Sequence, residues 1–277
     1  STLGYEKLYN GALNIADRDK FIASLTTDMP AAPDHFSRCS DINRRGPALV
    51  RTLPTPEPLA PKHFREKMAE EGILALDIRG YTAFSGQHVP GAYHIDMGGN
   101  FSTFAGWVLP PDRKILLVTN DGAEAAEAAV LLRRVGVDQV VGYLEGGMFE
   151  WAKAGFASDH VPLLSAPELQ QRITCGDGLT LVDVRSAGEF GAVHVEGALH
   201  IPAPELRTRH RELDPSRDIA LVCSTGHRSS LAASLLKRQG FSRVWNVAGG
   251  MTGFNAAGFA PECPLCVVPH GPRFLGK

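Results

Sequence analysis

A cysteine followed by a glycine-containing turn, an arginine and serines is the stretch of this sequence best suited to chemistry. Cys223 directly follows the apolar run DIALV (218–222), and STGHRSS follows it before a stretch rich in alanine and leucine begins. A tight loop that leads into a helix turns backbone N–H groups and the positive end of the helix dipole inward. Both favour a thiolate over a thiol, so Cys223 has the surroundings of a nucleophile.

The residues after Cys223 can shape the loop and meet a substrate. Gly226 can adopt a positive φ, which lets the loop close around a sulfur atom. Arg228 can hold an oxyanion such as the sulfonate end of thiosulfate, and His227 can tune charge or access at the rim. The alternative is that Cys223 is a small buried thiol, the commonest fate of a free cysteine. We favour a catalytic Cys223 with a substrate-binding loop of Ser224, Thr225, Gly226, His227, Arg228 and Ser229.

The elements that must hold this loop occur twice in the chain. LDIRGYTAFSGQHVPGAYHI (76–95) aligns with VDVRSAGEFGAVHVEGALHI (182–201), and ILLVTNDGAEAAEAAVLLRRVG (115–136) aligns with IALVCSTGHRSSLAASLLKRQG (219–240). In each copy, apolar runs alternate with helical segments, a pattern typical of a parallel sheet covered on both faces. Ligands of such sheets gather beyond the carboxyl ends of the strands, and Cys223 follows one of these ends. The sequence therefore predicts an α/β chain with two copies of one domain.

The repeat also suggests how the chain is divided. A proline-rich stretch at 51–62 and a short stretch at 157–164 are the expected linkers. We expect an N-terminal extension at 1–50 with a helix near 17–27, domains at 57–158 and 163–262, and a C-terminal tail at 263–277.

The loop and its surroundings resemble the rhodanese, or sulfurtransferase, family. CSTGHRS (223–229) matches the family's active-site pattern Cys-x-x-Gly-x-Arg-Ser/Thr. VDVRSAGEFGAVHVEGALHIP is similar to the family's Asp-Val-Arg…Glu-Phe…Gly-His-Ile-Pro-Gly-Ala…Asn-Ile-Pro, with departures at Val193, Glu196 and His200. VAGGMTGFNAAGF resembles the Gly-Gly…Trp…Ala-Gly ending, with Phe254 where tryptophan is usual. The resemblance covers about 57–262 and implies two rhodanese-like domains, each a parallel sheet flanked by helices.

The resemblance implies a sulfur-transfer mechanism. Cys223 would take a sulfane sulfur from a donor, become a persulfide stabilised by the loop amides, and pass the sulfur to a thiol or cyanide acceptor, without a metal or organic cofactor. Four residues separate Cys223 from Arg228, whereas phosphatases with a Cys-x5-Arg loop need five, so the smaller loop favours sulfur over phosphate. Thiosulfate, glutathione persulfide and a protein persulfide stay open as donors. The alternative function is a non-catalytic module that binds or senses persulfidated partners.

The first copy lacks the nucleophile. Thr119 stands at the position of Cys223, and Glu124 stands at the position of Arg228. A loop with these residues and Asp121 would repel an anionic donor, so we expect the first copy to be inactive and kept for packing, docking or shaping the entrance to the other domain.

Both copies keep an aspartate and an arginine at the end of the first predicted strand. Asp183 and Arg185 in the second copy correspond to Asp77 and Arg79 in the first. Since the pair is present with and without the cysteine, we expect Asp183 and Arg185 to support the site chiefly by bracing the fold.

The segment 1–50 matches neither copy. GYEKLYN within it resembles the C-terminal stretch of metallo-β-lactamase-fold persulfide dioxygenases, which bacterial fusions join to rhodanese domains. That family's metal motif, His-x-His-x-Asp-His, is absent from this sequence. The resemblance implies either that the chain is the C-terminal part of a longer fusion, with a dioxygenase domain as partner, or that the metal domain has been lost. We favour the longer fusion.

Composition excludes several function classes. A net charge of −2 gives no overall attraction to nucleic acid or an anionic membrane, and no apolar stretch is long enough to span a bilayer. Five cysteines are few and odd in number, unlike a secreted disulfide framework, so we expect a reducing cytoplasm. Cys263 and Cys266 form a lone C-x-x-C without a second pair for zinc; they are either a redox relay or two tail thiols.

Overall fold

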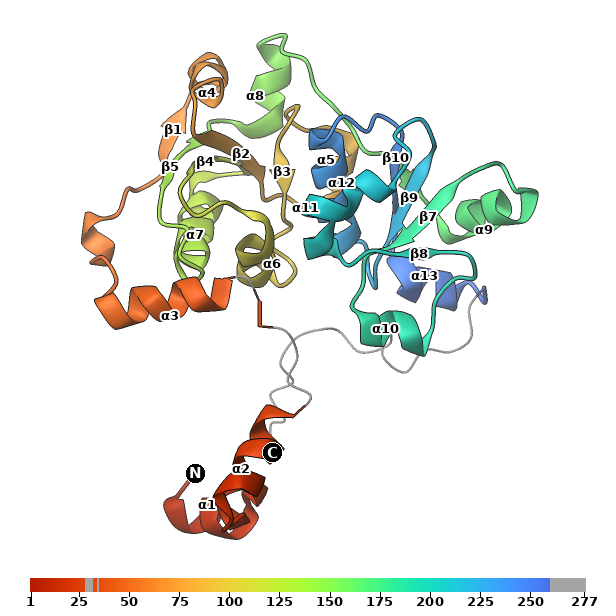
Figure 1. Ribbon diagram of the computed structural model, residues 1–277. Helices are drawn as coiled ribbons and strands as arrows, with labels where there is room; N and C mark the ends of the chain where they lie inside the picture. Colours follow the sequence, from red (N-terminus) through yellow and green to blue (C-terminus); the bar gives the residue numbers. More distant parts are fainter. Residues whose placement is uncertain (28–31, 34, 260–277) are drawn as a thin grey trace.

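Two five-stranded parallel sheets, one in each copy of the repeat, form the framework of the chain (Figure 1). The computed structural model describes residues 1–27, 32–33 and 35–259. Cys263 and Cys266 of the expected tail lie outside the described residues. The prediction of two α/β domains with parallel sheets and an N-terminal helical extension is confirmed.

The two sheets have the same topology. The first has the order β1-β5-β4-β2-β3 and the second the order β6-β10-β9-β7-β8. The first sheet consists of β1 (Glu57–Leu59), β2 (Ile73–Asp77), β3 (Tyr93–His94), β4 (Lys114–Val118) and β5 (Val140–Leu144). The second consists of β6 (Leu163–Leu164), β7 (Thr180–Asp183), β8 (Leu199–His200), β9 (Ile219–Val222) and β10 (Val244–Val247). Every residue of β9 is buried, as expected for a strand covered on both faces.

Helices cover both sheets. Those of the first domain are α4 (Pro61–Met68), α5 (Tyr81–Gly86), α6 (Phe101–Val108), α7 (Gly122–Arg133) and α8 (Gly147–Lys153). Those of the second domain are α9 (Ala166–Cys175), α10 (Ala187–Ala192), α11 (Leu206–Arg209), α12 (His227–Arg238) and α13 (Gly250–Ala256). Short 3₁₀ segments at Ala203–Glu205 and His210–Glu212 flank α11. Helices α9 and α10 each begin with a capping box, formed by Ser165 or Ser186 with the glutamate three residues on.

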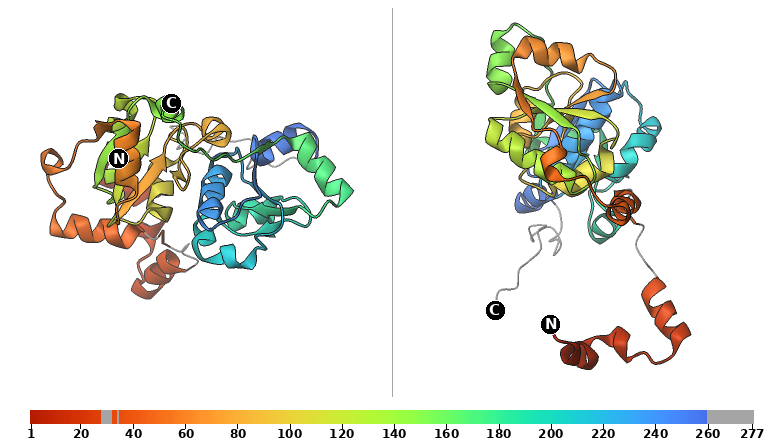
Figure 2. Two further views of the ribbon diagram at one scale, coloured as in Figure 1. Left: turned by 90° about the horizontal axis from the view of Figure 1, so that it is seen from above. Right: turned by 90° about the vertical axis from the view of Figure 1, so that its left-hand side faces the viewer.

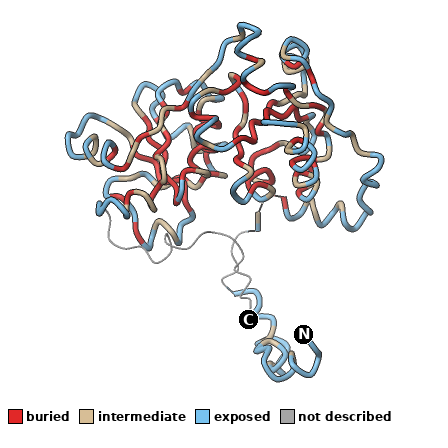
Figure 3. The backbone as a smooth tube through the Cα atoms, turned by 180° about the vertical axis from the view of Figure 1, so that it is seen from behind, coloured by how far each residue is buried: buried red, intermediate tan, exposed pale blue. Residues whose placement is uncertain are grey.

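The apolar core is continuous between the two domains. One cluster of buried side chains includes Leu76 and Ile95 of the first domain together with Leu231 and Leu235 of the second. Helix α12 supplies much of this contact, because it packs on β9 and β10 of its own sheet and on β3 of the other (Figure 1). The buried segments accordingly run through both halves of the molecule (Figure 3). Helix α12, which follows the Cys223 loop, is therefore in contact with both domains.

The N-terminal extension has one packed part and one exposed part. Helix α3 (His35–Arg45) lies against the first domain, where Arg38 donates two hydrogen bonds to the carbonyl oxygen of Val135. Helices α1 (Leu3–Tyr9) and α2 (Arg18–Thr26), with a 3₁₀ segment at Gly11–Asn14 between them, bury no residue and stand away from the two domains (Figure 2). A further 3₁₀ segment, Val50–Thr52, precedes β1. Within the described ranges, no helix is both long and apolar enough to cross a membrane.

Candidate active site

The thiol of Cys223 is buried at the end of β9, and donors surround its sulfur. Cys223 is 1% exposed. The N–H of Gly226 donates to Sγ at 3.1 Å, and the hydroxyl of Ser229 donates to Sγ at 3.3 Å. Gly226 has φ +104°, a conformation that other residues rarely adopt, and α12 begins at the next residue. These two donors stabilise negative charge on the sulfur, as expected for a thiolate nucleophile.

The turn at Gly249 and Gly250, which follows β10, positions the Cys223 loop through backbone hydrogen bonds. Met251 N–H donates to the carbonyl oxygen of Cys223 at 2.7 Å, and Thr252 N–H donates to that of Ser224 at 2.9 Å. A Cβ atom at Gly250 would lie 2.2 Å from the Cys223 carbonyl oxygen, so only glycine permits this approach. The orientation of the Cys223 loop thus depends on a turn well separated from it in sequence.

Arg228 is held by a carboxylate beside the nucleophile. Its Nη1 and Nη2 donate to the two oxygens of Glu189 at 2.7 and 2.6 Å, and the Ser224 hydroxyl donates to Glu189 Oε1 at 2.9 Å. Glu189 also caps the start of α10 through Ser186. Burial by itself raises the pKa of Glu189, but the hydrogen bonds and charge of Arg228 dominate and hold it far below its usual range. The arginine expected to hold an oxyanion is therefore already neutralised by Glu189.

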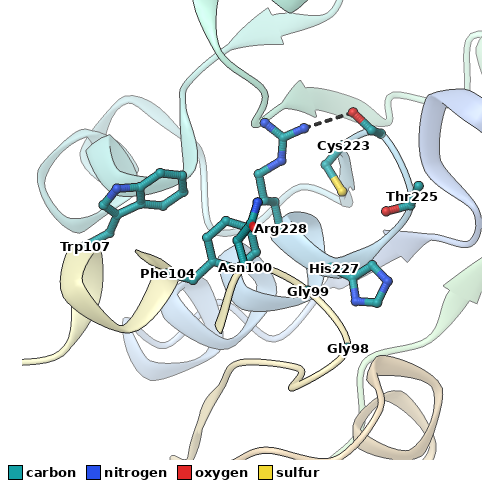
Figure 4. Close-up of a pocket in the computed structure, with 10 residues that line it drawn as sticks. Gly98, Gly99, Asn100, Phe104, Trp107, Cys223, Thr225, His227 and Arg228 are labelled. Atoms are coloured by element: carbon teal, nitrogen blue, oxygen red, sulfur yellow. Dashed lines mark hydrogen bonds between the residues drawn. The ribbon is translucent and has the colours of Figure 1, made fainter. Parts of the chain in front are cut away.

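A cavity of about 350 Å³ opens in front of Cys223 and is shared by both domains (Figure 4). The second domain contributes the predicted loop residues Cys223, Ser224, Thr225, His227 and Arg228. The first domain contributes Gly98, Gly99, Asn100, Phe104 and Trp107. None of these five residues is among those predicted from the sequence. The one sequence feature that could have indicated them is a difference in length: the connection 95–115 in the first copy is longer than the corresponding connection 201–219 in the second.

The remaining predicted residues take different places. Ser229 donates to the cysteine sulfur and is fully buried. Asp183 and Arg185 are fully buried, and the Arg185 side chain donates to both oxygens of Asp183, from Nε at 2.9 Å and from Nη2 at 2.6 Å. Arg185 also donates to the carbonyl oxygen of Val193. Asp77 and Arg79 form the same pair in the first domain, with the same two distances. These contacts support a bracing role, since they do not depend on the cysteine.

In the first domain, the carboxylate of Glu124 accepts the hydrogen bonds of the loop that corresponds to the Cys223 loop. Glu124 accepts hydrogen bonds from the Thr119 hydroxyl at 2.8 Å and from the backbone N–H of Asn120 at 3.1 Å. Burial raises the pKa of Glu124, but these hydrogen bonds from Asn120 and Thr119 outweigh it and lower the pKa. A negative charge thus lies beside Thr119, the residue at the position of Cys223.

Metal chemistry has no visible ligand set in the described part of the chain. No group of three or more histidine, cysteine, aspartate and glutamate side chains is placed there to hold a metal ion. Cys39 and Cys175, which also lie in the described residues, are free thiols away from the cavity.

Known proteins resemble both copies of the repeat. The model of the rhodanese-like domain family matches residues 60–154 and 165–257. A sulfurtransferase of Allochromatium vinosum is 31% identical over 102 residues, 36% of this chain and 95% of the relative. YrkF of Bacillus subtilis is 36% identical over 91 residues, 33% of this chain and 49% of YrkF, so the match spans about half of that relative. A solved structure, a metallo-beta-lactamase from Staphylococcus aureus, has 31% identity and a TM-score of 0.42, with 52% of this chain and 38% of that chain covered.

Proposed function

This chain belongs to the family of proteins with rhodanese-like domains, and from that premise we propose that it is a sulfurtransferase that carries sulfane sulfur on Cys223. One observation carries the proposal: a buried thiol at the end of β9 receives hydrogen bonds from Gly226 and Ser229 and faces a cavity. A structural thiol needs no such donors, whereas a nucleophile and its anionic adduct do.

In the first step, the Cys223 thiolate attacks the outer sulfur of the donor. With thiosulfate, the donor's S–S bond breaks, its electron pair leaves with sulfite, and Cys223 becomes a persulfide anion. With a low-molecular-weight persulfide such as glutathione persulfide, the leaving group is the donor's thiolate. The donors on Gly226 and Ser229 then stabilise the charged persulfide, which is the intermediate of a double displacement.

In the second step, a thiolate or cyanide attacks the outer sulfur of the persulfide. The bond between Cys223 Sγ and the carried sulfur breaks, and its electron pair returns to Sγ. The thiolate is restored, and the sulfur leaves as a new persulfide or as thiocyanate. The cavity of about 350 Å³ has room for an organic acceptor as well as for a small sulfur anion.

Intact mass spectrometry tests the proposal. The wild-type protein, incubated with thiosulfate or glutathione persulfide, should gain the mass of one sulfur atom, and cyanide or glutathione should remove it. Cys223→Ser should gain none, and Cys175→Ser, which changes an exposed free thiol, should behave as wild type. A wild-type protein that gains no sulfur from either donor would contradict the proposal.

The same experiment separates the enzyme from a binding module. A rhodanese-fold module that senses persulfidated partners would accept sulfur on Cys223 but keep it in the presence of acceptors. Sulfur that stays on the protein after cyanide and glutathione are added would favour this alternative.

The N-terminal helices suggest a larger assembly. Residues 1–50 resemble the end of persulfide dioxygenases, and α1 leaves Leu3, Leu8 and Tyr9 exposed at 69%, 73% and 70%. These residues fit a role in docking on a metallo-β-lactamase-fold dioxygenase domain of a longer cytoplasmic bacterial fusion. The mass of the protein isolated from its natural source tests this: a mass of only 29.8 kDa would overturn it.

A further inference from the structure

The helix that carries the catalytic loop is bound by the first, cysteine-free domain. His94 on β3 contacts α12 twice: its Nδ1 lies 2.9 Å from the Ser230 hydroxyl, and its backbone N–H donates to the Ser234 hydroxyl at 3.0 Å. His94, Ser230 and Ser234 are all 0% exposed. Polar contacts in such a buried interface have defined geometry, because an unpaired group there is costly.

The hydrogen-bond partners of His94 determine which of its ring nitrogens carries the hydrogen. His94 Nε2 lies 2.9 Å from the carbonyl oxygen of Arg79, which can only accept, so Nε2 carries the hydrogen. Burial lowers the pKa of His94 and keeps the ring neutral, so Nδ1 must accept. Ser230 is therefore the donor in the contact across the domains. The ring also stacks on Phe84, with centroids 4.3 Å apart, which fixes its orientation.

A second contact reaches the first residue of the same helix. His227 Nδ1 lies 3.0 Å from Asp96 Oδ2, at an angle outside that of a regular hydrogen bond. Asp96 is itself fixed by the N–H groups of Gly98 and Tyr81, at 2.7 and 2.8 Å. The Tyr81 ring also packs on the loop, since a Cβ atom at Gly226 would lie 2.9 Å from it.

We infer that His94 and Asp96 of the inactive domain are positioning residues for sulfur transfer at Cys223. The inference rests on the proposed function. The contacts hold Ser230 and His227 on either side of Ser229, whose hydroxyl donates to the cysteine sulfur. Neither residue touches the sulfur; together they fix the first turn of α12, and so keep the donors aimed at the nucleophile.

The other copy provides a matched control. His200 corresponds to His94: its Nε2 lies 2.9 Å from the carbonyl oxygen of Arg185, and its ring stacks on Phe190 at 4.5 Å. Among the described residues, no hydrogen bond joins His200 to the first domain. Replacing either histidine removes the same local contacts, but only the change at His94 removes a contact with α12.

The experiment compares His94→Ala, Ser230→Ala and Asp96→Asn with His200→Ala in the full chain. The readouts are the melting temperature, kcat and KM for sulfur transfer from thiosulfate to cyanide, and the rate at which iodoacetamide alkylates Cys223. We expect kcat and the alkylation rate to fall about 10-fold or more in the first three variants, with KM changed less than about two-fold. Ser230→Ala is the most informative of these variants, because it removes one hydroxyl without opening a large cavity.

The outcomes distinguish the inference from the function. Rates equal to wild type in Ser230→Ala and Asp96→Asn would overturn the inference while sulfur transfer stands. An equal loss in His94→Ala and His200→Ala would also overturn it, because the effect would then be local to each domain. A wild-type protein without transfer activity contradicts the proposed function, and the alkylation rates still decide the positioning role.

Discussion

The carboxylate of Glu189 and the guanidinium of Arg228 face each other through two hydrogen bonds of 2.7 and 2.6 Å beside Cys223. The two side chains are 12% and 14% exposed, so little solvent screens the pair. The arginine therefore has two roles beside Cys223: it lines the cavity, and it neutralises a carboxylate that would otherwise leave an unpaired negative charge there.

Arg228→Ala should impair both stability and sulfur transfer. The change leaves the Glu189 charge without its partner near the nucleophile, which we expect to lower the free energy of unfolding by about 3 kcal/mol. The same charge should slow persulfide formation from thiosulfate at least about 100-fold. Urea unfolding and stopped-flow kinetics measure the two effects. Arg209→Ala is the control, because its ion pairs with Glu205 and Glu212 are exposed to solvent and contribute little to stability. Equal losses in the two variants would contradict the prediction.

The Glu189 carboxylate should make stability depend on pH in the acid range. Burial opposes its ionisation, but the contacts with Arg228 and Ser186 lower its pKa far below the ordinary value of 4.5. A group whose pKa is lower in the folded state contributes stability above its unfolded pKa, and that stability is lost as the pH falls. The difference in unfolding free energy between wild type and Glu189→Gln should therefore be constant above about pH 5 and narrow below about pH 4. A difference that does not change with pH would exclude this role.

Gly226→Ala should disturb the Cys223 loop strongly, although it adds only one methyl group. The residue has φ +104°, and its new Cβ would lie 2.9 Å from the Tyr81 ring of the other domain. We expect a loss of about 2 kcal/mol in stability and a slower alkylation of Cys223, because the Gly226 N–H would no longer point at the sulfur. Gly188→Ala on α10 is the control: nothing lies within 4 Å of its Cβ position, so stability should be unchanged or slightly higher. Wild-type alkylation in Gly226→Ala would refute the prediction.

Trp107→Ala should distinguish organic donors from small anions. The indole lines the cavity from the first domain and offers an apolar surface to the organic part of a persulfide (Figure 4). We expect KM for glutathione persulfide to rise about 10-fold and KM for thiosulfate to change less than about two-fold. Phe149→Ala is the control, since this aromatic residue of the same domain is 72% exposed and does not line the cavity. An equal rise for both donors would show that Trp107 does not select between them.

Much of the fold and one side of the site could be predicted from the sequence. The alternation of apolar runs with helical segments predicts both sheets because burial on two faces demands apolar residues throughout a strand such as β9. The loop from Cys223 to Ser229 is contiguous, so its turn, its amides and the start of its helix are local properties. The loss of the nucleophile at Thr119 can likewise be inferred from the alignment of the two copies.

The residues that contact these local features could be identified only from the tertiary structure. The neutralisation of Arg228 by Glu189 joins residues 39 positions apart, and the contact between His94 and Ser230 joins residues 136 positions apart. Periodicity reports which face of an element is buried, but it does not report what that face meets. The sequence by itself determined two α/β domains and one cysteine-containing loop that leads into a helix. Only the packing of the two domains decided that the first domain supplies Phe104 and Trp107 to the cavity and binds α12, because those contacts arise from two surfaces that no local pattern connects.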